Sequence, residues 1–143
     1  TGSLALVFGK SGLLSVDYGF QDMSNAKLGP ERDAAFAAAN SEISNQLGAT
    51  STIKVGGEYR IARFSLRGGY RFEQSPYENS DLVGDLQGIS AGLGYDFGGS
   101  RLDLALARSE RDTALRLFDT GLTTPATINR INTNVTLGYT YNF

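Results

Sequence analysis

The chain has neither cysteine nor histidine among its 143 residues. These absences exclude a cysteine nucleophile, a Ser-His-Asp triad and the usual zinc ligand sets within the chain. Tryptophan is also missing, the net charge is only −2, and no basic cluster is interleaved with aromatic residues. We therefore expect a protein that is not an enzyme, that uses no cofactor and that has no nucleic-acid partner.

Long hydrophobic runs are missing as well. No segment approaches the roughly 20 apolar residues of a transmembrane helix. Nothing at Thr1 resembles a signal peptide, so for an exported protein we expect this start to be a mature or truncated end. The chain is instead rich in glycine, with 18 residues, and it has 7 tyrosines and 8 phenylalanines. Aromatic residues pack well on sheets and glycine permits tight turns, so this composition favours a β-rich chain.

The dominant pattern is alternation of apolar and polar residues, which predicts strands with one apolar face. It is clearest in residues 131–143, where Thr133 is the only polar member of the apolar face. The pattern predicts about seven strands in all, several of them long enough to cross a bilayer when tilted. The other six predicted strands cover residues 3–9, 14–20, 53–60, 63–72, 89–97 and 102–117.

The predicted connections alternate between short and long. Short turns are expected at residues 10–12, 61–62 and 98–100, and long ones at 24–50, 75–85 and 118–129. Bacterial outer-membrane barrels have short periplasmic turns and longer extracellular loops. We therefore predict an all-β fold, a transmembrane antiparallel up-and-down β-barrel in the bacterial outer membrane, with Phe143 on the periplasmic side.

In this orientation the first predicted strand also descends from the extracellular side. Bacterial barrels normally have an even number of strands. We therefore expect residues 1–143 to be the C-terminal portion of a longer barrel, with at least one strand before Thr1. A miscounted weak strand is the alternative.

The first long loop is predicted to contain a helix. Pro30 near its start and Gly48 after its end are suitable boundary residues. Phe36, Ile43 and Leu47 would form one apolar stripe along it. We expect an extracellular-loop helix packed over the barrel mouth, with a functional lid as the alternative.

The last eight residues resemble the C-terminal assembly signal of outer-membrane barrels, in which a polar residue, a glycine and two aromatics recur at fixed spacing. Thr136, Gly138, Tyr141 and Phe143 occupy those four places. The resemblance implies recognition by the barrel-assembly machinery, and an exposed strand edge is a ready template for strand pairing. The alternative is an ordinary amphipathic strand that ends in Phe.

The apolar faces are expected to contact outer-membrane lipid, because a Lys or Arg facing the bilayer midplane costs about 2–4 kcal/mol. The apolar faces of the best strands carry no charge. Tyr59, Tyr70, Tyr139 and Tyr141 would form aromatic girdles near the two interfaces.

Three arginines, Arg63, Arg67 and Arg71, fall on the polar face of one predicted strand. In a barrel they would be lumen contacts. Ion pairing is the simpler interpretation, and the acidic residues on the other polar faces are Asp17, Glu58, Asp96 and Asp103. An anion contact in a transport path is the alternative, since Arg binds carboxylates well.

An acidic loop contains Glu78, Asn79, Asp81 and Asp85. Their spacing does not match a known calcium-binding loop, so no metal site is predicted.

The stretch Arg67 to Tyr77 resembles the FadL/TodX transporters of hydrophobic compounds, in which Arg-x-Gly precedes an aromatic and a Ser-Pro pair. The matching residues here are Arg67, Gly69, Phe72, Ser75 and Pro76. The run 89–97, the short turn after it and the run 102–106 resemble the next hairpin of that family. The segment 118–129 is similar to members from Bacteroidetes-like bacteria.

This resemblance implies a barrel of about 14 strands, of which the chain would supply the second half. It implies transport of long-chain fatty acids or other hydrophobic small molecules across the outer membrane. The family's N-terminal plug and its lateral opening have no counterpart within this sequence, so the resemblance transfers no ligand-site residue.

A channel or transporter for hydrophobic compounds is therefore the leading hypothesis. The alternative is a structural or adhesion-type outer-membrane barrel whose loops bind. An outer-membrane enzyme is disfavoured by the missing histidine. A soluble barrel such as a lipocalin would turn its apolar face inward around a ligand, whereas these polar faces carry arginines and many glycines.

Overall fold

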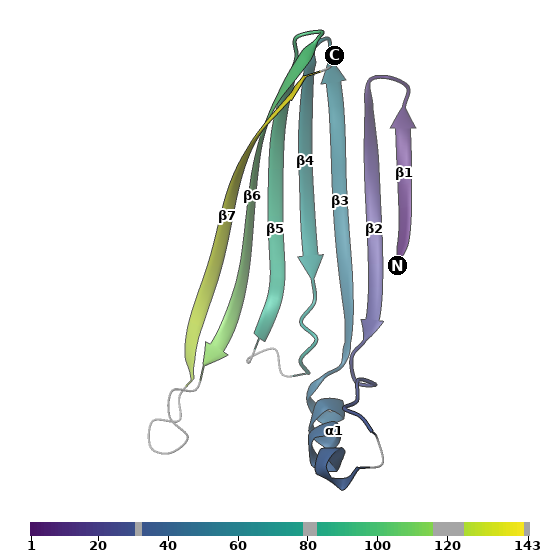
Figure 1. Cartoon of the computed structure of the whole chain (residues 1–143), viewed down its shortest axis with the longest axis vertical. Helices are drawn as coiled ribbons and strands as arrows, with labels where there is room; N and C mark the ends of the chain where they lie inside the picture. The colour runs from purple at the N-terminus through teal and green to yellow at the C-terminus, as the bar shows by residue number, and fades with distance from the viewer. Residues whose placement is uncertain (31–32, 79–82, 116–124, 142–143) are drawn as a thin grey trace.

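The computed structural model describes residues 1–30, 33–78, 83–115 and 125–141. They form seven strands and one helix, and the strands make a single antiparallel sheet in chain order (Figure 1). The elements are β1 (Gly2–Phe8), β2 (Gly12–Asp22), α1 (Ala34–Gln46), β3 (Ala49–Ile61), β4 (Phe64–Glu73), β5 (Val83–Asp96), β6 (Ser100–Leu115) and β7 (Ala126–Tyr141). The predicted all-β, up-and-down arrangement of seven strands is confirmed, and the sheet is open.

The connections are sorted between the two ends of the sheet, as the sequence predicted. Residues 9–11, 62–63 and 97–99 make short turns at one end, whereas α1 and the β4–β5 connection lie at the other (Figure 1). Gly9, Ala62 and Gly98 have φ angles of 58°, 52° and 98°. Positive φ lets the chain reverse within two or three residues, and glycine adopts it at little cost.

Several strands are longer than their apolar alternation indicated. β5 begins at Val83 and not near Ile89, and β7 begins at Ala126. The extra length of β7, residues 126–130, is mostly polar and pairs with the charged end of β6, for example Asn129 with Asp112. Backbone hydrogen bonds continue the ladder irrespective of side-chain polarity, which is why an alternation pattern underestimates strand length there.

The predicted loop helix is present as α1, and it begins after Asp33, whose side chain accepts a hydrogen bond from the Ala35 amide at 3.0 Å. Phe36, Ile43 and Leu47 are half-buried while most of the helix is exposed, so the predicted stripe is its inner side. The Asn40 side chain accepts from the Leu28 amide at 2.7 Å and donates to the Leu28 carbonyl at 3.1 Å.

The C-terminal end of α1 is tied to the connection between β4 and β5. Leu47 forms an isolated β-bridge with Tyr77. The Gly48 amide donates to the Pro76 carbonyl at 2.8 Å, and the Glu78 amide donates to the Gln46 carbonyl at 2.9 Å. Two connections that are far apart in the sequence are therefore held side by side.

The sheet has no hydrophobic core within the described residues. Only Ser65, Ser75 and Gly94 are buried there, while most large apolar side chains are exposed. A sheet in a water-soluble domain normally buries its apolar face against a second layer, and the described elements supply none. No helix in the described part of the chain is long and apolar enough to cross a membrane.

Candidate functional site

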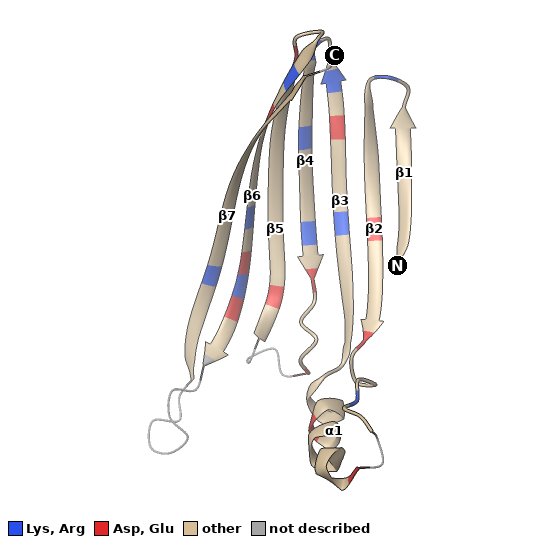
Figure 2. Ribbon diagram, in the orientation of Figure 1, with Lys and Arg blue, Asp and Glu red and all other residues tan. Residues whose placement is uncertain are grey.

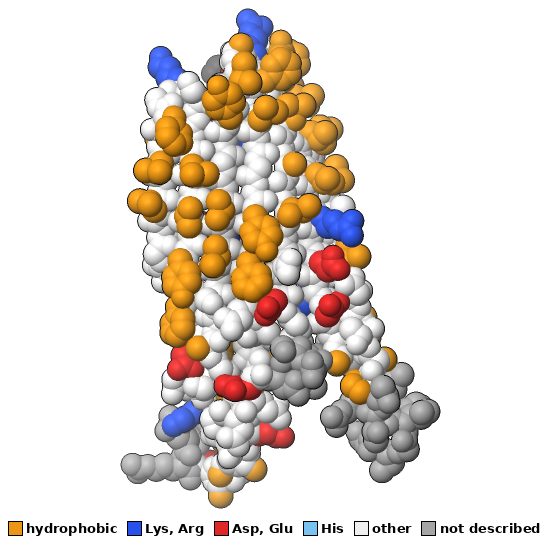
Figure 3. All heavy atoms as spheres, turned by 180° about the vertical axis from the view of Figure 1, so that it is seen from behind, with side chains coloured by type: hydrophobic (Ala, Val, Ile, Leu, Met, Phe, Trp, Pro, Cys, Tyr) orange, Lys and Arg blue, Asp and Glu red, His pale blue; other side chains and the backbone are white. Residues whose placement is uncertain are grey.

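The apolar side chains form a continuous zone on one face of the sheet (Figure 3). Cross-strand partners in an antiparallel sheet share a face, and apolar residues meet in this way along several hydrogen-bonded rows. One such row runs through Ile61, Phe64, Tyr95, Leu102 and Tyr139. The next row on this face runs through Phe8, Gly12, Tyr59, Leu66, Leu93, Leu104 and Leu137.

The zone crosses these rows diagonally. Val16 and Thr133 belong to one row, which runs Leu4, Val16, Val55, Tyr70, Ile89, Arg108, Thr133. The row is apolar as far as β5 and polar on β6 and β7. On β2 the zone continues past this row to Phe20, whereas on β6 it ends before the row, at Leu106. Figure 3 shows the band descending from β6 and β7 toward β1 and β2.

If the strands are tilted so that the band runs horizontally, the slope of the band across the hydrogen-bonded rows gives the tilt angle of the strands. Between Phe20 on β2 and Val135 on β7 the edge moves by about 1.2 residues per strand, which at about 3.3 Å per residue and 4.8 Å between strands corresponds to a tilt of about 40°. Ile131, which is also apolar and on this face of β7, lies beyond this edge, past Thr133. On β2 and β3 the band spans about nine residues, so at this tilt it is about 22 Å high.

Three charged residues of β6 share a face with the apolar zone but lie outside its edge. They are Arg108, Glu110 and Asp112, all near the end of β6 that leads to the long β6–β7 connection. The Asn129 amide donates to Glu110 at 2.6 Å and to Asp112 at 2.8 Å. The charge-free apolar face expected for the best strands therefore holds within the zone but not along the whole of β6.

Aromatic rings gather near the short-turn edge of the zone. The rings of Phe64 and Tyr95 are 4.8 Å apart and those of Tyr95 and Phe97 are 4.7 Å apart, both edge-to-face. Of the four tyrosines predicted to form girdles, Tyr59, Tyr139 and Tyr141 lie toward this edge, whereas Tyr70 lies between Val55 and Ile89, one row from the opposite edge.

The opposite face carries a chain of ion pairs near the short-turn end. Arg67 Nε donates to Glu58 at 2.6 Å and its Nη1 donates to Asp103 at 2.8 Å. Glu58 also contacts Arg60, and Asp103 accepts from Arg101 Nε at 2.9 Å. The two carboxylates are thus each held between two guanidinium groups, on β3, β4 and β6 (Figure 2).

Glycines on β5 let this series of ion pairs cross that strand. Arg67 pairs with Gly92 in the register, and Asp103 pairs with Gly94. A Cβ atom on Gly94 would lie 2.5 Å from Asp103 Oδ1 and 2.7 Å from Arg101 Nη2. The missing side chain therefore leaves the space in which Arg67 reaches a strand that is not its neighbour.

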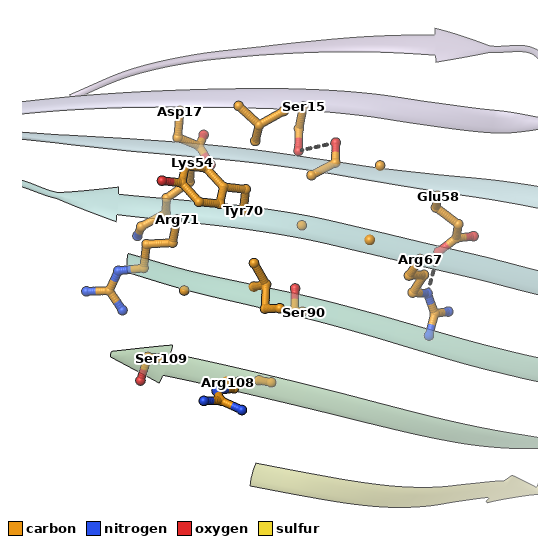
Figure 4. Close-up of a pocket in the computed structure, with 18 of the residues that line it drawn as sticks. Ser15, Asp17, Lys54, Glu58, Arg67, Tyr70, Arg71, Ser90, Arg108 and Ser109 are labelled. Carbon is orange, nitrogen blue, oxygen red and sulfur yellow. Dashed lines mark hydrogen bonds and ion pairs between the residues drawn. The ribbon is translucent and has the colours of Figure 1, made fainter. Parts of the chain in front are cut away.

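A second group lies nearer the long connections. Glu73 contacts Arg71, and it accepts from Arg111 Nη2 at 2.9 Å. Between the two groups the polar face has a depression of about 590 Å³. Its floor is a row of small residues, Ser15, Gly56, Gly69 and Ser90. Lys54 and Arg71 stand at its side nearer the long connections (Figure 4).

The three arginines singled out in the sequence have different places. Arg67 and Arg71 are in the two ion-pair groups, whereas Arg63 lies in the β3–β4 turn, where its carbonyl accepts from the Asp96 amide at 2.9 Å. Within the described residues the Arg63 side chain has no ion pair. Arg101, Arg111 and Glu73 were missed. Only the strand register places Arg111 beside Glu73, whereas Glu73 and Arg101 lie two residues from Arg71 and Asp103 on the same strand face, so alternation could have found them.

The four acidic residues placed on polar faces also separate. Glu58 and Asp103 pair with Arg67. Asp96 accepts from the Gly98 amide at 2.7 Å and so stabilises a turn. Asp17 is the cross-strand partner of Lys54 without an ion pair between them.

The residues of the predicted assembly signal lie on β7. Thr136 and Gly138 are on the polar face, where Gly138 pairs with Asp103, and Tyr141 is on the apolar face. Phe143 lies outside the described residues. In the acidic loop, Asp85 accepts from the Ser75 amide at 2.8 Å, while Asn79 and Asp81 lie outside the described residues. The described part of the chain contains no group of three acidic residues that could hold a metal ion.

Comparison with known proteins finds no matching family model, no matching curated protein and no matching solved structure.

Proposed function

We propose that the chain forms part of the wall of a transmembrane β-barrel in the bacterial outer membrane. The apolar zone would face lipid and the polar face would line the interior. The observation that carries this proposal is the diagonal course of the zone across the hydrogen-bonded rows. In a water-soluble sheet nothing requires such a slope.

The magnitudes agree with a membrane setting. Strands of transmembrane barrels tilt by about 35–45° and present an apolar band about 25 Å tall. The slope of the zone corresponds to about 40° and its height to about 22 Å. The charged group of Arg108, Glu110 and Asp112 would then lie beyond the bilayer core, where charges cost about 0–1 kcal/mol.

The connections support one orientation. Short turns are periplasmic and longer loops extracellular in bacterial barrels, so α1 and the β4–β5 connection would face outward. The resemblance to assembly signals at Thr136, Gly138 and Tyr141 supports the barrel-assembly machinery as a partner.

Within this barrel we propose a channel or transporter, and the similarity of Arg67–Tyr77 to the FadL/TodX family favours long-chain fatty acids or other hydrophobic compounds. That family also implies a barrel of about 14 strands. A second candidate, a barrel whose loops bind a partner, is favoured by the hydrogen bonds that join α1 to the β4–β5 connection.

Two experiments separate these proposals. A folded outer-membrane barrel purified in detergent should migrate differently before and after boiling, and stable solubility without detergent would contradict membrane insertion. Cells that lack the gene should take up radiolabelled long-chain fatty acid more slowly. Unchanged uptake of several hydrophobic compounds would contradict the transport proposal while leaving the membrane proposal in place.

A further inference from the structure

The two ion-pair groups on the polar face differ in how well their charges are compensated. In the group near the short turns, Arg60, Arg67 and Arg101 each contact a carboxylate, and Glu58 and Asp103 each contact two of these arginines. Nearer the long connections a single carboxylate, Glu73, serves both Arg71 and Arg111. This second half of the face therefore carries uncompensated positive charge.

Like charges also face one another in this half. Lys54 is the direct cross-strand partner of Arg71, and Arg130 is the direct partner of Arg111. Cβ atoms of such partners are about 4.5–5.5 Å apart, and like charges placed opposite each other destabilise a sheet. Two of these pairs, in consecutive rows of one face, are a local conflict of the kind that marks functional positions.

Only one member of each pair has an acidic partner, because Arg71 and Arg111 share Glu73. Among the described residues Lys54 and Arg130 form no ion pair, although Asp17 is the partner of Lys54 on its other side. Arg111 Nε is buried without a hydrogen-bond partner in the described structure, as is Arg101 Nη2 in the other group. Glu110 and Asp112 carry negative charge close by along β6 but point to the opposite face.

We propose that the polar face around Lys54, Arg71, Arg111 and Arg130 binds small oxyanions, such as phosphate or a carboxylate. Guanidinium groups bind these anions through paired hydrogen bonds, and a lysine adds a point charge. An anion between the facing cations would remove the like-charge conflict. The depression of about 590 Å³ beside Lys54 and Arg71 has room for a hydrated anion. This inference rests on the proposed function, because the site would give the interior of the proposed barrel a preference for anions.

In the first test, inorganic phosphate is added to the detergent-solubilised protein at constant ionic strength. The width of the ³¹P resonance reports binding. Broadening should occur with the unaltered protein and should fall by at least half in the double variant Lys54→Gln, Arg130→Gln. These two side chains have no ion pair within the described residues, so their loss leaves no carboxylate unpaired. Lys10→Gln, in the β1–β2 turn, is the matched control and should leave the broadening unchanged.

Acetate, as a competitor, distinguishes a general oxyanion site from one that takes phosphate alone. If acetate displaces phosphate, the site binds oxyanions in general. If acetate does not displace phosphate, the site binds phosphate but not a carboxylate. Absence of broadening with the unaltered protein, or equal broadening in the double variant, would overturn the inference whether or not the protein inserts into membranes.

A second measurement tests whether the site affects ion permeation through the interior of the proposed barrel. In planar bilayers under a KCl gradient, the reversal potential should show that chloride permeates faster than potassium. Lys54→Glu should shift the reversal potential toward the equilibrium potential of potassium, whereas Lys10→Glu should leave it unchanged. Faster permeation of potassium through the unaltered protein would overturn the anion preference. Failure of the heat-modifiability test would instead overturn the barrel proposal.

Discussion

Arg67 on β4 reaches across the whole of β5 to Asp103 on β6, with its Nη1 2.8 Å from the carboxylate. The contact joins two strands that share no hydrogen-bonded edge. It depends on glycine at the crossing, because a Cβ on Gly94 would lie 2.5 Å from Asp103 Oδ1. The polar face is thus held together by side chains that act across strands as well as by the backbone ladder.

Gly94→Ala should weaken this arrangement. The new methyl group would displace the Asp103 carboxylate from Arg67 and Arg101, and we expect a loss of about 1 kcal/mol in the free energy of unfolding, since hydrogen bonds to charged groups are worth about 1.5–3 kcal/mol and partial exposure reduces this. Urea unfolding in detergent measures it. Gly99→Ala is the control, because nothing lies within 4 Å of a Cβ there; an equal loss in both variants would contradict the crossing argument.

Gly138→Ala should separate stability from assembly. A Cβ at Gly138 would lie 3.9 Å from Asp103 Cβ, an ordinary contact, so the free energy of unfolding should change by less than about 0.5 kcal/mol. If Gly138 is part of an assembly signal, the heat-modifiable fraction in cells should nevertheless fall. Unchanged assembly in cells would argue against a role for this glycine in recognition.

Ala62→Gly should stabilise the protein. Ala62 has a φ of 52° in the β3–β4 turn, a conformation that costs a residue with a side chain about 1–2 kcal/mol. Glycine removes this cost but loses about 0.5–1 kcal/mol of chain entropy, so the net gain should be about 0.5 kcal/mol in urea unfolding. Ala49→Gly, at the exposed start of β3, lacks positive φ and should instead destabilise. A loss of stability in Ala62→Gly would show that the turn is not strained.

Asn40→Ala should loosen the segment before α1. The substitution removes both hydrogen bonds between the Asn40 side chain and the Leu28 backbone. Limited proteolysis should then cleave near Leu28 faster, while strand unfolding stays unchanged because these bonds lie outside the sheet. Asn45→Ala, on the exposed side of the same helix, is the control. Equal cleavage rates in the two variants would mean that Asn40 does not anchor this segment.

Much of the fold follows from local pattern. Alternation predicted the seven strands, and the short and long gaps between the alternating runs predicted their connections, because both are properties of neighbouring residues. Cross-strand relationships were not accessible in this way. The contacts of Arg111 with Glu73 and of Arg67 with Asp103 can be placed only when the register is known, and the same holds for the opposition of Lys54 to Arg71.

The edge of the apolar zone was hidden for the same reason. Arg108 follows Leu102, Leu104 and Leu106 at the same spacing and so shares their face. From sequence alone it interrupts an apolar face. In the register it lies in the row of Val16, which is apolar on β2. The row is apolar on β2 and charged on β6 because the strands are tilted relative to the zone, so that one row passes from inside the zone to outside it. This tilt is a property of the whole sheet and is not visible in one strand.

If the apolar zone faces lipid, two positions in one hydrogen-bonded row lie at different depths in the bilayer. Val16 is at the middle of the apolar zone on β2, whereas Thr133, in the same row and on the same face, lies beyond its edge on β7. Val16 pairs with the apolar residues Leu4 and Val55, whereas an arginine at position 133 would also stand opposite Arg108. That like-charge pair can only raise the cost of Thr133→Arg. A water-soluble sheet would make the two substitutions similar in cost.

The direct test is the free energy of unfolding of Val16→Arg and Thr133→Arg, measured by urea titration of the protein folded into lipid vesicles. The account predicts a loss of about 2–4 kcal/mol for Val16→Arg and about 0–1 kcal/mol for Thr133→Arg. Equal losses, or a larger loss for Thr133→Arg, would contradict it.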